Sequence, residues 1–141
     1  MRDEYKKILV TVDGSDHAKE AVHEAIAIAK RNETSLTILH VKDETRVSGS
    51  PYALAQTLEE LEQESQAIIA DIKRLVADQV EYDFQYYAGN PKKEIVKFSK
   101  DFEMDLIVIG SNSKGLLDRM LVGSTTTYVI NHAPCNVMVV K

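Results

Sequence analysis

The sequence predicts a single doubly wound α/β domain of the Rossmann or flavodoxin-like type, and two observations carry this prediction. Short runs rich in β-branched apolar residues recur along the chain, which is typical of strands buried on both faces of a parallel sheet. A segment with helical periodicity follows each of the first four runs, so strands and helices alternate strictly. Because each crossover is expected to be right-handed, helices should cover both faces of the sheet.

Five segments are expected to form the strands. Four are continuous apolar runs, at residues 8–12, 36–41, 106–109 and 137–140. The fifth, at residues 82–87, is more amphipathic and is therefore expected nearer an edge of the sheet.

Three of the four expected helices have clear end signals. Small apolar residues at three- and four-residue spacing indicate the first helix over 18–29, with Ser15 or Asp16 as its N-cap. Pro91 suits the first turn of the third helix. The fourth spans 124–132 and ends at Ala133, because Pro134 follows.

The second helix is expected to be long. Apolar residues repeat at alternating spacings of four and three over 54–75, with an interruption at Ser65. Both a coiled coil and a helix packed on the sheet fit this stripe, and the interruption favours packing on the sheet. The Ser-, Gly- and Pro-containing residues 45–51 before it are expected to form a mobile loop.

Composition and charge narrow the classes of function. The 141 residues include 17 Lys and Arg against 22 Asp and Glu, a formal charge of −5, which argues against a nucleic-acid partner. No run of about 18 apolar residues occurs, so no membrane-spanning helix is expected. Cys135 has no second cysteine for an internal disulfide, which is typical of a reducing compartment, and a cytoplasmic location is expected.

The predicted fold locates the candidate site. Doubly wound sheets bind ligands beyond the carboxyl ends of their strands, where neighbouring connections leave toward opposite faces. The candidate residues at these ends are Thr11, Val12 and Asp13 after the first strand, Val41 after the second, and Gly110 and Ser111 after the fourth.

The segment 110–127 has the composition of a phosphate site. Gly110 begins a loop that contains Gly and Ser, and Gly123, Ser124 and Thr125 open the helix that follows. Backbone N–H groups and the positive end of a helix dipole would meet phosphate there. A plain strand end and a helix cap produce the same pattern, and spacing alone does not separate the two accounts.

Other nucleotide motifs and other chemistries have little support. The residues after Gly115 are not the Lys and Ser/Thr of a P-loop, and no G-x-G-x-x-G follows the first strand. The four histidines lack metal-ligand spacing, and His40, inside a buried strand, is expected to be a hydrogen-bonded core residue. Cys135 is expected to be a packing residue. No G-x-S-x-G motif occurs, and no catalytic residue is predicted.

The sequence resembles the universal stress protein family over nearly its whole length. The resemblance rests on KILVTVDGSDHAKEA at 7–21, LHV at 39–41, GNPKKEIV at 89–96, DLIVIGSNSKG at 105–115 and LVGSTTTYVINHAPCNVMVVK at 121–141. It implies one domain over residues 1–141 with a five-stranded parallel sheet in the order 3-2-1-4-5. It also implies a homodimer through the last strand, and that strand's apolar edge supports this expectation.

One branch of this family binds ATP through the motif G-x2-G-x9-G-[S/T]. The resemblance sets the first glycine at Gly110, the last at Gly123 and the hydroxyl at Ser124. Ser113 replaces the middle glycine, and its Cβ resists the backbone conformations that glycine permits. Gly115, two residues later, is a candidate for a displaced turn.

The resemblance also assigns the rest of the site. Asp13 and the backbone of Val41 are implied to line the ribose and adenine ends of the pocket. Lys114 and Arg119 are candidates to balance phosphate charge, Arg119 by a bidentate contact.

The leading hypothesis is therefore a cytoplasmic universal stress protein that binds an adenine nucleotide, ATP with Mg²⁺, as a regulatory or sensor homodimer. A nucleotide-free dimeric scaffold is an alternative, which the Ser113 replacement favours. An ATP-pyrophosphatase type of enzyme is a third reading, because VDGSD at 12–16 is similar to a pyrophosphate-binding loop. The segment lacks the second glycine of that loop.

Overall fold

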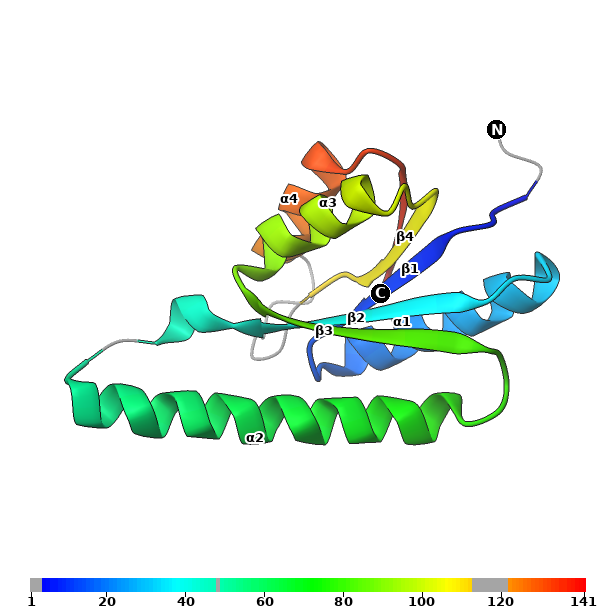
Figure 1. Ribbon diagram of the computed structural model, residues 1–141. Coiled ribbons are helices and arrows are strands. Elements are labelled where there is room, and N and C mark those ends of the chain that lie inside the picture. The colour runs from blue at the N-terminus through cyan, green and yellow to red at the C-terminus, as the bar shows by residue number, and fades with distance from the viewer. Residues whose placement is uncertain (1–3, 48, 113–121) are drawn as a thin grey trace.

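The computed structural model describes residues 4–47, 49–112 and 122–141, and in them five strands alternate with four α-helices (Figure 1). The strands are β1 (Ile8–Val12), β2 (Leu36–Asp43), β3 (Tyr82–Gly89), β4 (Leu106–Gly110) and β5 (Asn136–Val140). The helices are α1 (Asp16–Arg31), α2 (Pro51–Val76), α3 (Pro91–Asp101) and α4 (Ser124–His132), and a short 3-10 helix, η1 (Glu44–Arg46), follows β2. The alternation confirms the predicted fold class.

The sheet has the strand order β3-β2-β1-β4-β5, and every neighbouring pair is parallel. This is the order 3-2-1-4-5 that the family resemblance implied. Helices α1 and α2 cover one face, and α3 and α4 cover the other (Figure 1). The chain therefore leaves the carboxyl ends of the neighbouring strands β1 and β4 toward opposite faces of the sheet, to α1 and to α4 respectively.

The side chains on the two faces of β1 belong to two separate hydrophobic cores. Ile8, Val10 and Val12 pack in the layer of α1 and α2, whereas Leu9 packs in the layer of α3 and α4. All five residues of the strand are buried, since it is paired on both edges and covered on both faces. Double burial is the physical reason for the continuous apolar run in the sequence.

β2 and β3 are longer than the sequence predicted. Their parallel ladder continues to the pair of Asp43 and Gly89, two residues beyond each expected end. The extra residues of β2, Lys42 and Asp43, are charged, so they lack the apolar signal on which the prediction depended. Main-chain pairing with β3 holds them in the strand regardless of their side chains.

The loop predicted over 45–51 is shorter than expected, and that boundary was wrong. Thr45 and Arg46 belong to η1, which begins where the Asp43 carboxylate accepts a hydrogen bond from the Thr45 N–H at 3.0 Å. Pro51 is the first residue of α2, and the Ser50 hydroxyl caps this helix by accepting from the Ala53 N–H at 3.2 Å. Local caps thus extend regular structure into the Ser- and Gly-rich segment.

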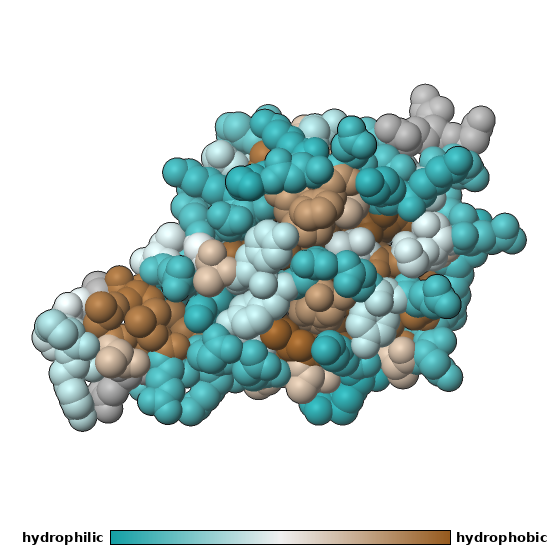
Figure 2. All heavy atoms as spheres, viewed as in Figure 1, coloured by the Kyte–Doolittle hydropathy of each residue, from teal (hydrophilic) through white to brown (hydrophobic). Residues whose placement is uncertain are grey.

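Helix α2 packs on the sheet, as the interrupted stripe predicted. Ser65, Ile68 and Ile72 are buried, while Leu54 near the start of the helix is 36% exposed. The first turns project past the end of the sheet (Figure 1), and apolar side chains gather at this end of the molecule (Figure 2). None of the helices in the described ranges combines the length and the apolar content needed to cross a bilayer.

The end of β4 packs tightly against the start of α1. A Cβ on Gly110 would lie 2.8 Å from the backbone carbon of His17 and 3.0 Å from the nitrogen of Ala18. Backbone atoms of a helix cannot yield locally, so glycine is required here by packing.

Replacing Gly110 by Ala is therefore expected to lower the free energy of unfolding by about 1–3 kcal/mol through overpacking. Urea denaturation of the purified variant and the parent measures this difference. Equal midpoints would mean that α1 can shift away from β4 at no cost, contrary to the close contact described above.

Candidate functional site

A cavity of about 650 Å³ lies at the carboxyl ends of β1, β2 and β4, in the size range of small-molecule sites. Seven residues that the sequence singled out line it: Thr11, Val12, Asp13, Val41, Gly110, Ser124 and Thr125. They come from three strand ends and from the first turn of α4. The fold thus brings together residues that are more than 100 positions apart in the sequence.

Ser111 and Gly123 are not among the lining residues, and both are buried. The Gly123 N–H donates to the Ser111 carbonyl at 2.7 Å, and the Ser111 N–H donates to the Val140 carbonyl at 2.8 Å. The buried Thr126 hydroxyl adds a bond to the Gly110 carbonyl at 2.7 Å. Ser113, Gly115 and Arg119, together with Lys114, lie outside the described residues.

The first turn of α4 opens toward the cavity. Gly123 is the N-cap and Ser124 the first helical residue, and the first bond inside the helix runs from the Thr127 N–H to the Gly123 carbonyl at 2.9 Å. Within the described part of the chain, no hydrogen bond uses the N–H groups of Ser124, Thr125 or Thr126. Unused N–H groups at the positive end of a helix dipole form an anion-binding arrangement.

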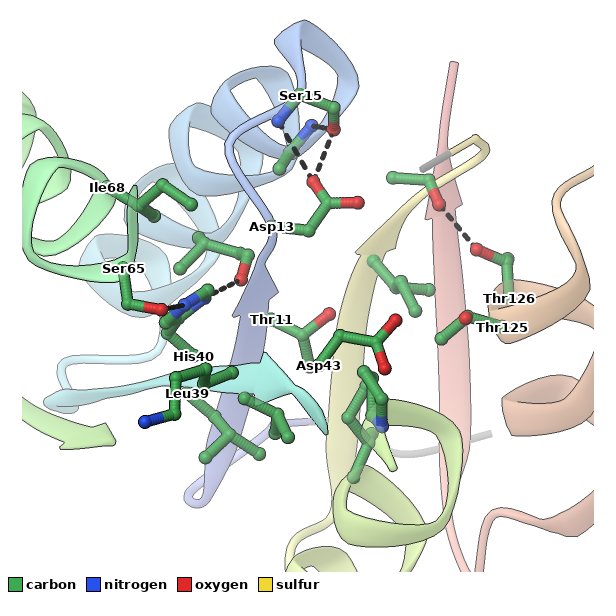
Figure 3. A pocket seen from close by; sticks show the side chains of 18 of the residues that line it. Thr11, Asp13, Ser15, Leu39, His40, Asp43, Ser65, Ile68, Thr125 and Thr126 are labelled. Atoms are coloured by element: carbon green, nitrogen blue, oxygen red, sulfur yellow. Dashed lines mark hydrogen bonds between the residues drawn. The ribbon is translucent and has the colours of Figure 1, made fainter. Parts of the chain in front are cut away.

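Asp13 stands at the end of β1, between the strand and α1. Its Oδ1 accepts from the Ser15 N–H at 3.0 Å and from the Ser15 hydroxyl at 2.6 Å, while the same hydroxyl oxygen accepts from the Ala18 N–H at 3.1 Å (Figure 3). Asp13 therefore closes the turn into α1, and it lines the cavity as well. These hydrogen bonds hold the carboxylate in a defined orientation.

His40 and Ser65 form a buried polar bridge in the cavity wall. His40 is 4% exposed, with Nδ1 2.8 Å from the Val12 carbonyl and Nε2 2.9 Å from the Ser65 hydroxyl (Figure 3). Since a carbonyl only accepts, Nδ1 carries the proton, and Nε2 accepts from Ser65. This confirms His40 as a hydrogen-bonded core residue and explains why Ser65 interrupts the apolar stripe of α2.

Burial lowers the pKa of His40 below its usual 6.5. The bond to the Val12 carbonyl and the charges of Asp13, Glu64 and Glu62 oppose this shift without reversing it. His40 is thus neutral at neutral pH, as its two hydrogen bonds require.

A second polar cluster attaches α2 to β2 and β3. The Glu62 carboxylate accepts from the Tyr86 hydroxyl, from Gln66 at 2.9 Å and from Lys42 at 3.0 Å. These bonds lower the pKa of Glu62 to about 2, with the Tyr86 bond as the largest cause. Glu62 is thus ionised at all physiological pH values, and it neutralises the lysine nearest the cavity.

Several cavity residues were not predicted from the sequence. They include Asp43 at the end of β2, Arg46 in η1, Glu64 on α2, and the buried Asn112 after β4. Arg46 pairs with Glu64 at 3.4 Å. Asp43 lies two residues after Val41 on the same strand, and recognising that β2 continues past Val41 would have indicated it.

The described residues include no group of three or more His, Cys, Asp or Glu side chains placed to hold a metal ion. Asp13 and Asp43 are nevertheless carboxylates in the cavity wall. Mg²⁺ is usually held by one or two carboxylates together with substrate phosphates, so it fits this site only as part of a metal–nucleotide complex.

A parallel sheet in this strand order, with a cavity at its strand ends, defines the doubly wound α/β class, whose members bind ligands at that position. The model of the universal stress protein family matches residues 4–141, and the chain belongs to this family. A Staphylococcus epidermidis protein named as a member of it is 35% identical over 140 residues, covering 97% of this chain and 84% of that protein.

Solved structures agree. The universal stress protein UspA from Lactobacillus plantarum is 35% identical with a TM-score of 0.87, and covers 99% of this chain and 100% of its own. The structure of protein MJ0577 is 31% identical with a TM-score of 0.83, and covers 97% of this chain and 96% of its own.

Three more distant structures share the fold and were solved with ligands. They are a universal stress protein in complex with cAMP at 23% identity, one from Archaeoglobus fulgidus with dAMP at 22%, and one from Arabidopsis thaliana with AMP at 20%. Their TM-scores are 0.63, 0.72 and 0.70, in the same order.

The His40 bridge predicts a specific pH dependence of stability. Because the pKa of His40 is lowered on folding, the unfolded chain binds a proton at this residue more readily than the folded chain. The stabilisation that neutral, buried His40 gives the fold is therefore fully present above pH 6.5 and is lost as the pH falls below this value. In His40→Asn the amide can still donate to the Val12 carbonyl but does not titrate. The stability advantage of the parent over this variant should narrow between about pH 7.5 and about pH 5.5.

Urea denaturation of both proteins at the two pH values measures this narrowing, and the other three histidines are present in both proteins. Ser65→Ala provides a matched variant, which is expected to cost about 1–2 kcal/mol because Nε2 loses its donor. A constant difference between parent and His40→Asn across this range would contradict a titrating, buried His40.

Proposed function

We propose that this protein binds an adenine nucleotide in the cavity at the ends of β1, β2 and β4. The observation that carries the proposal is the first turn of α4, whose first three N–H groups make no hydrogen bond to any described residue and suit the 5′-phosphate of a nucleotide. The Asp13 carboxylate on the neighbouring strand suits the ribose hydroxyls. Three relatives of the same fold were solved with cAMP, dAMP and AMP, which supports an adenine nucleotide as the ligand class.

More specifically, we propose that the protein is a regulatory or sensor homodimer in the cytoplasm and that its nucleotide is ATP with Mg²⁺. Residues Thr11, Val12, Asp13, Val41, Gly110, Ser124 and Thr125 would contact the nucleotide. Gly123 and Ser111 would support the phosphate end, since their mutual hydrogen bond sets the start of α4. Ser113, Gly115 and Arg119 remain candidate contacts for the distal phosphates.

Nucleotide-free protein, prepared by unfolding and refolding through a desalting step, tests the ligand class directly. Calorimetric titration with AMP, cAMP, ADP and ATP, the last two with and without Mg²⁺, is expected to give saturable binding for at least one of them. Binding should also raise the melting temperature. If none of the four nucleotides binds, the nucleotide-free dimeric scaffold becomes the better account.

An added carboxylate in the first turn of α4 tests the phosphate position. Thr125→Asp sets a negative charge in the cavity lining beside the N–H groups, and it should weaken nucleotide binding by at least about tenfold. Asn131→Asp is the matched control, because it adds the same charge to an exposed position near the other end of the same helix.

Calorimetry measures both affinities, and the melting temperatures without ligand show whether each variant is folded. Equal affinity of Thr125→Asp and the parent would require the phosphate to bind elsewhere than at α4.

We propose the homodimer on the exposed edge of β5. This strand pairs only with β4 in the described sheet, and Met138 on it is 37% exposed. A bare apolar edge invites pairing with another strand, and two-fold symmetry would bring the same residues of two copies together.

Met138→Glu should then convert the dimer to a 15.8 kDa monomer, because like charges would face each other across the two-fold axis. Sedimentation velocity at micromolar concentration measures this change. Tyr52→Glu is the control, since it removes a 76% exposed aromatic residue at the start of α2. A parent that sediments as a monomer would contradict the proposed assembly.

A further inference from the structure

Asp43 has an unused acceptor that faces the cavity. Its Oδ1 accepts from both the N–H and the hydroxyl of Thr45, and in the described ranges no hydrogen bond reaches its Oδ2. The residue is half-buried and lines the cavity. Figure 3 shows its carboxylate turned into the space between the end of β1 and the first turn of α4.

The strand order fixes which part of a nucleotide meets this carboxylate. Along the edge of the sheet the order is β4, β1 and then β2, so Asp43 is two strand spacings, about 10 Å, from the strand that leads to α4. A nucleotide has its phosphate, sugar and base in the same linear order. With the phosphate at α4, the sugar and the base are the parts that reach β2.

The neighbouring charges make a phosphate an unsuitable partner for Asp43. Lys42 is paired with Glu62, and Arg46 with Glu64, so the described cations at this end are already neutralised. An ionised carboxylate only accepts hydrogen bonds. A ligand that displaces water from Oδ2 must therefore supply an N–H or O–H donor, or leave a partly buried charge unpaired.

We propose that Asp43 is a specificity-determining residue of the nucleotide site, whose carboxylate accepts a hydrogen bond from a donor on the base or sugar of the ligand. The proposal rests on the nucleotide-binding function proposed above. The two sources of the donor are the exocyclic amino group of adenine and the hydroxyls of ribose. In either case the site rejects an analogue that lacks this donor, as sites that bind a polar substrate group do.

The test compares AMP with three analogues that keep the same 5′-phosphate. IMP replaces the amino group by a carbonyl oxygen, while 2′-deoxy-AMP and 3′-deoxy-AMP each lack one hydroxyl. The parent is expected to bind at least one analogue about tenfold or more weakly than AMP, and the analogue affected identifies the donor. Ratios to AMP are compared because any change of repulsion on the shared phosphate cancels in them.

Two substitutions separate the ligand contact from the capping role of Asp43. In Asp43→Ser the hydroxyl can still cap η1 but is too short to reach the ligand. The variant should therefore bind AMP and the affected analogue with affinities within about threefold of each other. Asp43→Asn keeps an oxygen for Thr45 and presents an amide N–H₂ to the cavity. If Asp43 contacts the base, this variant should bind IMP better than AMP, because its N–H₂ can donate to the carbonyl oxygen of IMP. If Asp43 contacts a ribose hydroxyl, the variant should still bind AMP somewhat better than the deoxy analogue, because a hydroxyl also accepts hydrogen bonds.

Thr45→Val is the matched control, since it removes the hydroxyl that binds Oδ1 and leaves the carboxylate in place. Its ratios should equal those of the parent. The proposal is overturned if the parent binds all four nucleotides within about threefold of one another, or if Asp43→Ser keeps the ratio of the parent. A parent that binds none of the four contradicts the proposed function itself, which separates that failure from a failure of Asp43 to discriminate.

Discussion

The position of β1 is the constraint on which the rest of the structure depends. It is paired with β2 on one edge and with β4 on the other, and helices cover both of its faces. Such a strand must be largely apolar, and Thr11, next to its carboxyl end, is its single polar residue. The chain leaves β1 and the neighbouring β4 toward opposite faces of the sheet, and the cavity lies where these two connections diverge.

The polar groups around the cavity divide into those used by the fold and those left for a ligand. The Ser111 and Gly123 backbones bond to each other, and Thr126 bonds to the end of β4, so the start of α4 is held against the end of β4 without any ligand. The N–H groups one to three residues further along α4 have no such partners in the described chain. A helix start held in place by hydrogen bonds, with further N–H donors left open, is the preorganised arrangement that favours anion binding.

Helix α2 is attached to the strand ends at the cavity by side-chain hydrogen bonds. The bridge from Val12 through His40 to Ser65, and the cluster around Glu62, hold the middle of this helix beside the ends of β2 and β3. Its apolar residue Ile68 both lines the cavity and packs in the core, and Ile72 packs one turn further along in the same core. Through these polar and apolar contacts the middle of α2 forms one wall of the site.

The sequence by itself determined the features that depend on neighbouring residues. Four continuous apolar runs and one amphipathic segment located the five strands, and periodic spacing located the helices. Local sequence also limited the N-cap of α1 to Ser15 or Asp16, and the cap is Ser15. Only the tertiary structure decided the partners of His40, which lie 25 and 28 residues away, and the inclusion of Asp43 and Glu64 in the cavity. These contacts depend on strand register and on where α2 crosses the sheet, and no local pattern encodes either, because both arise from the packing of whole elements.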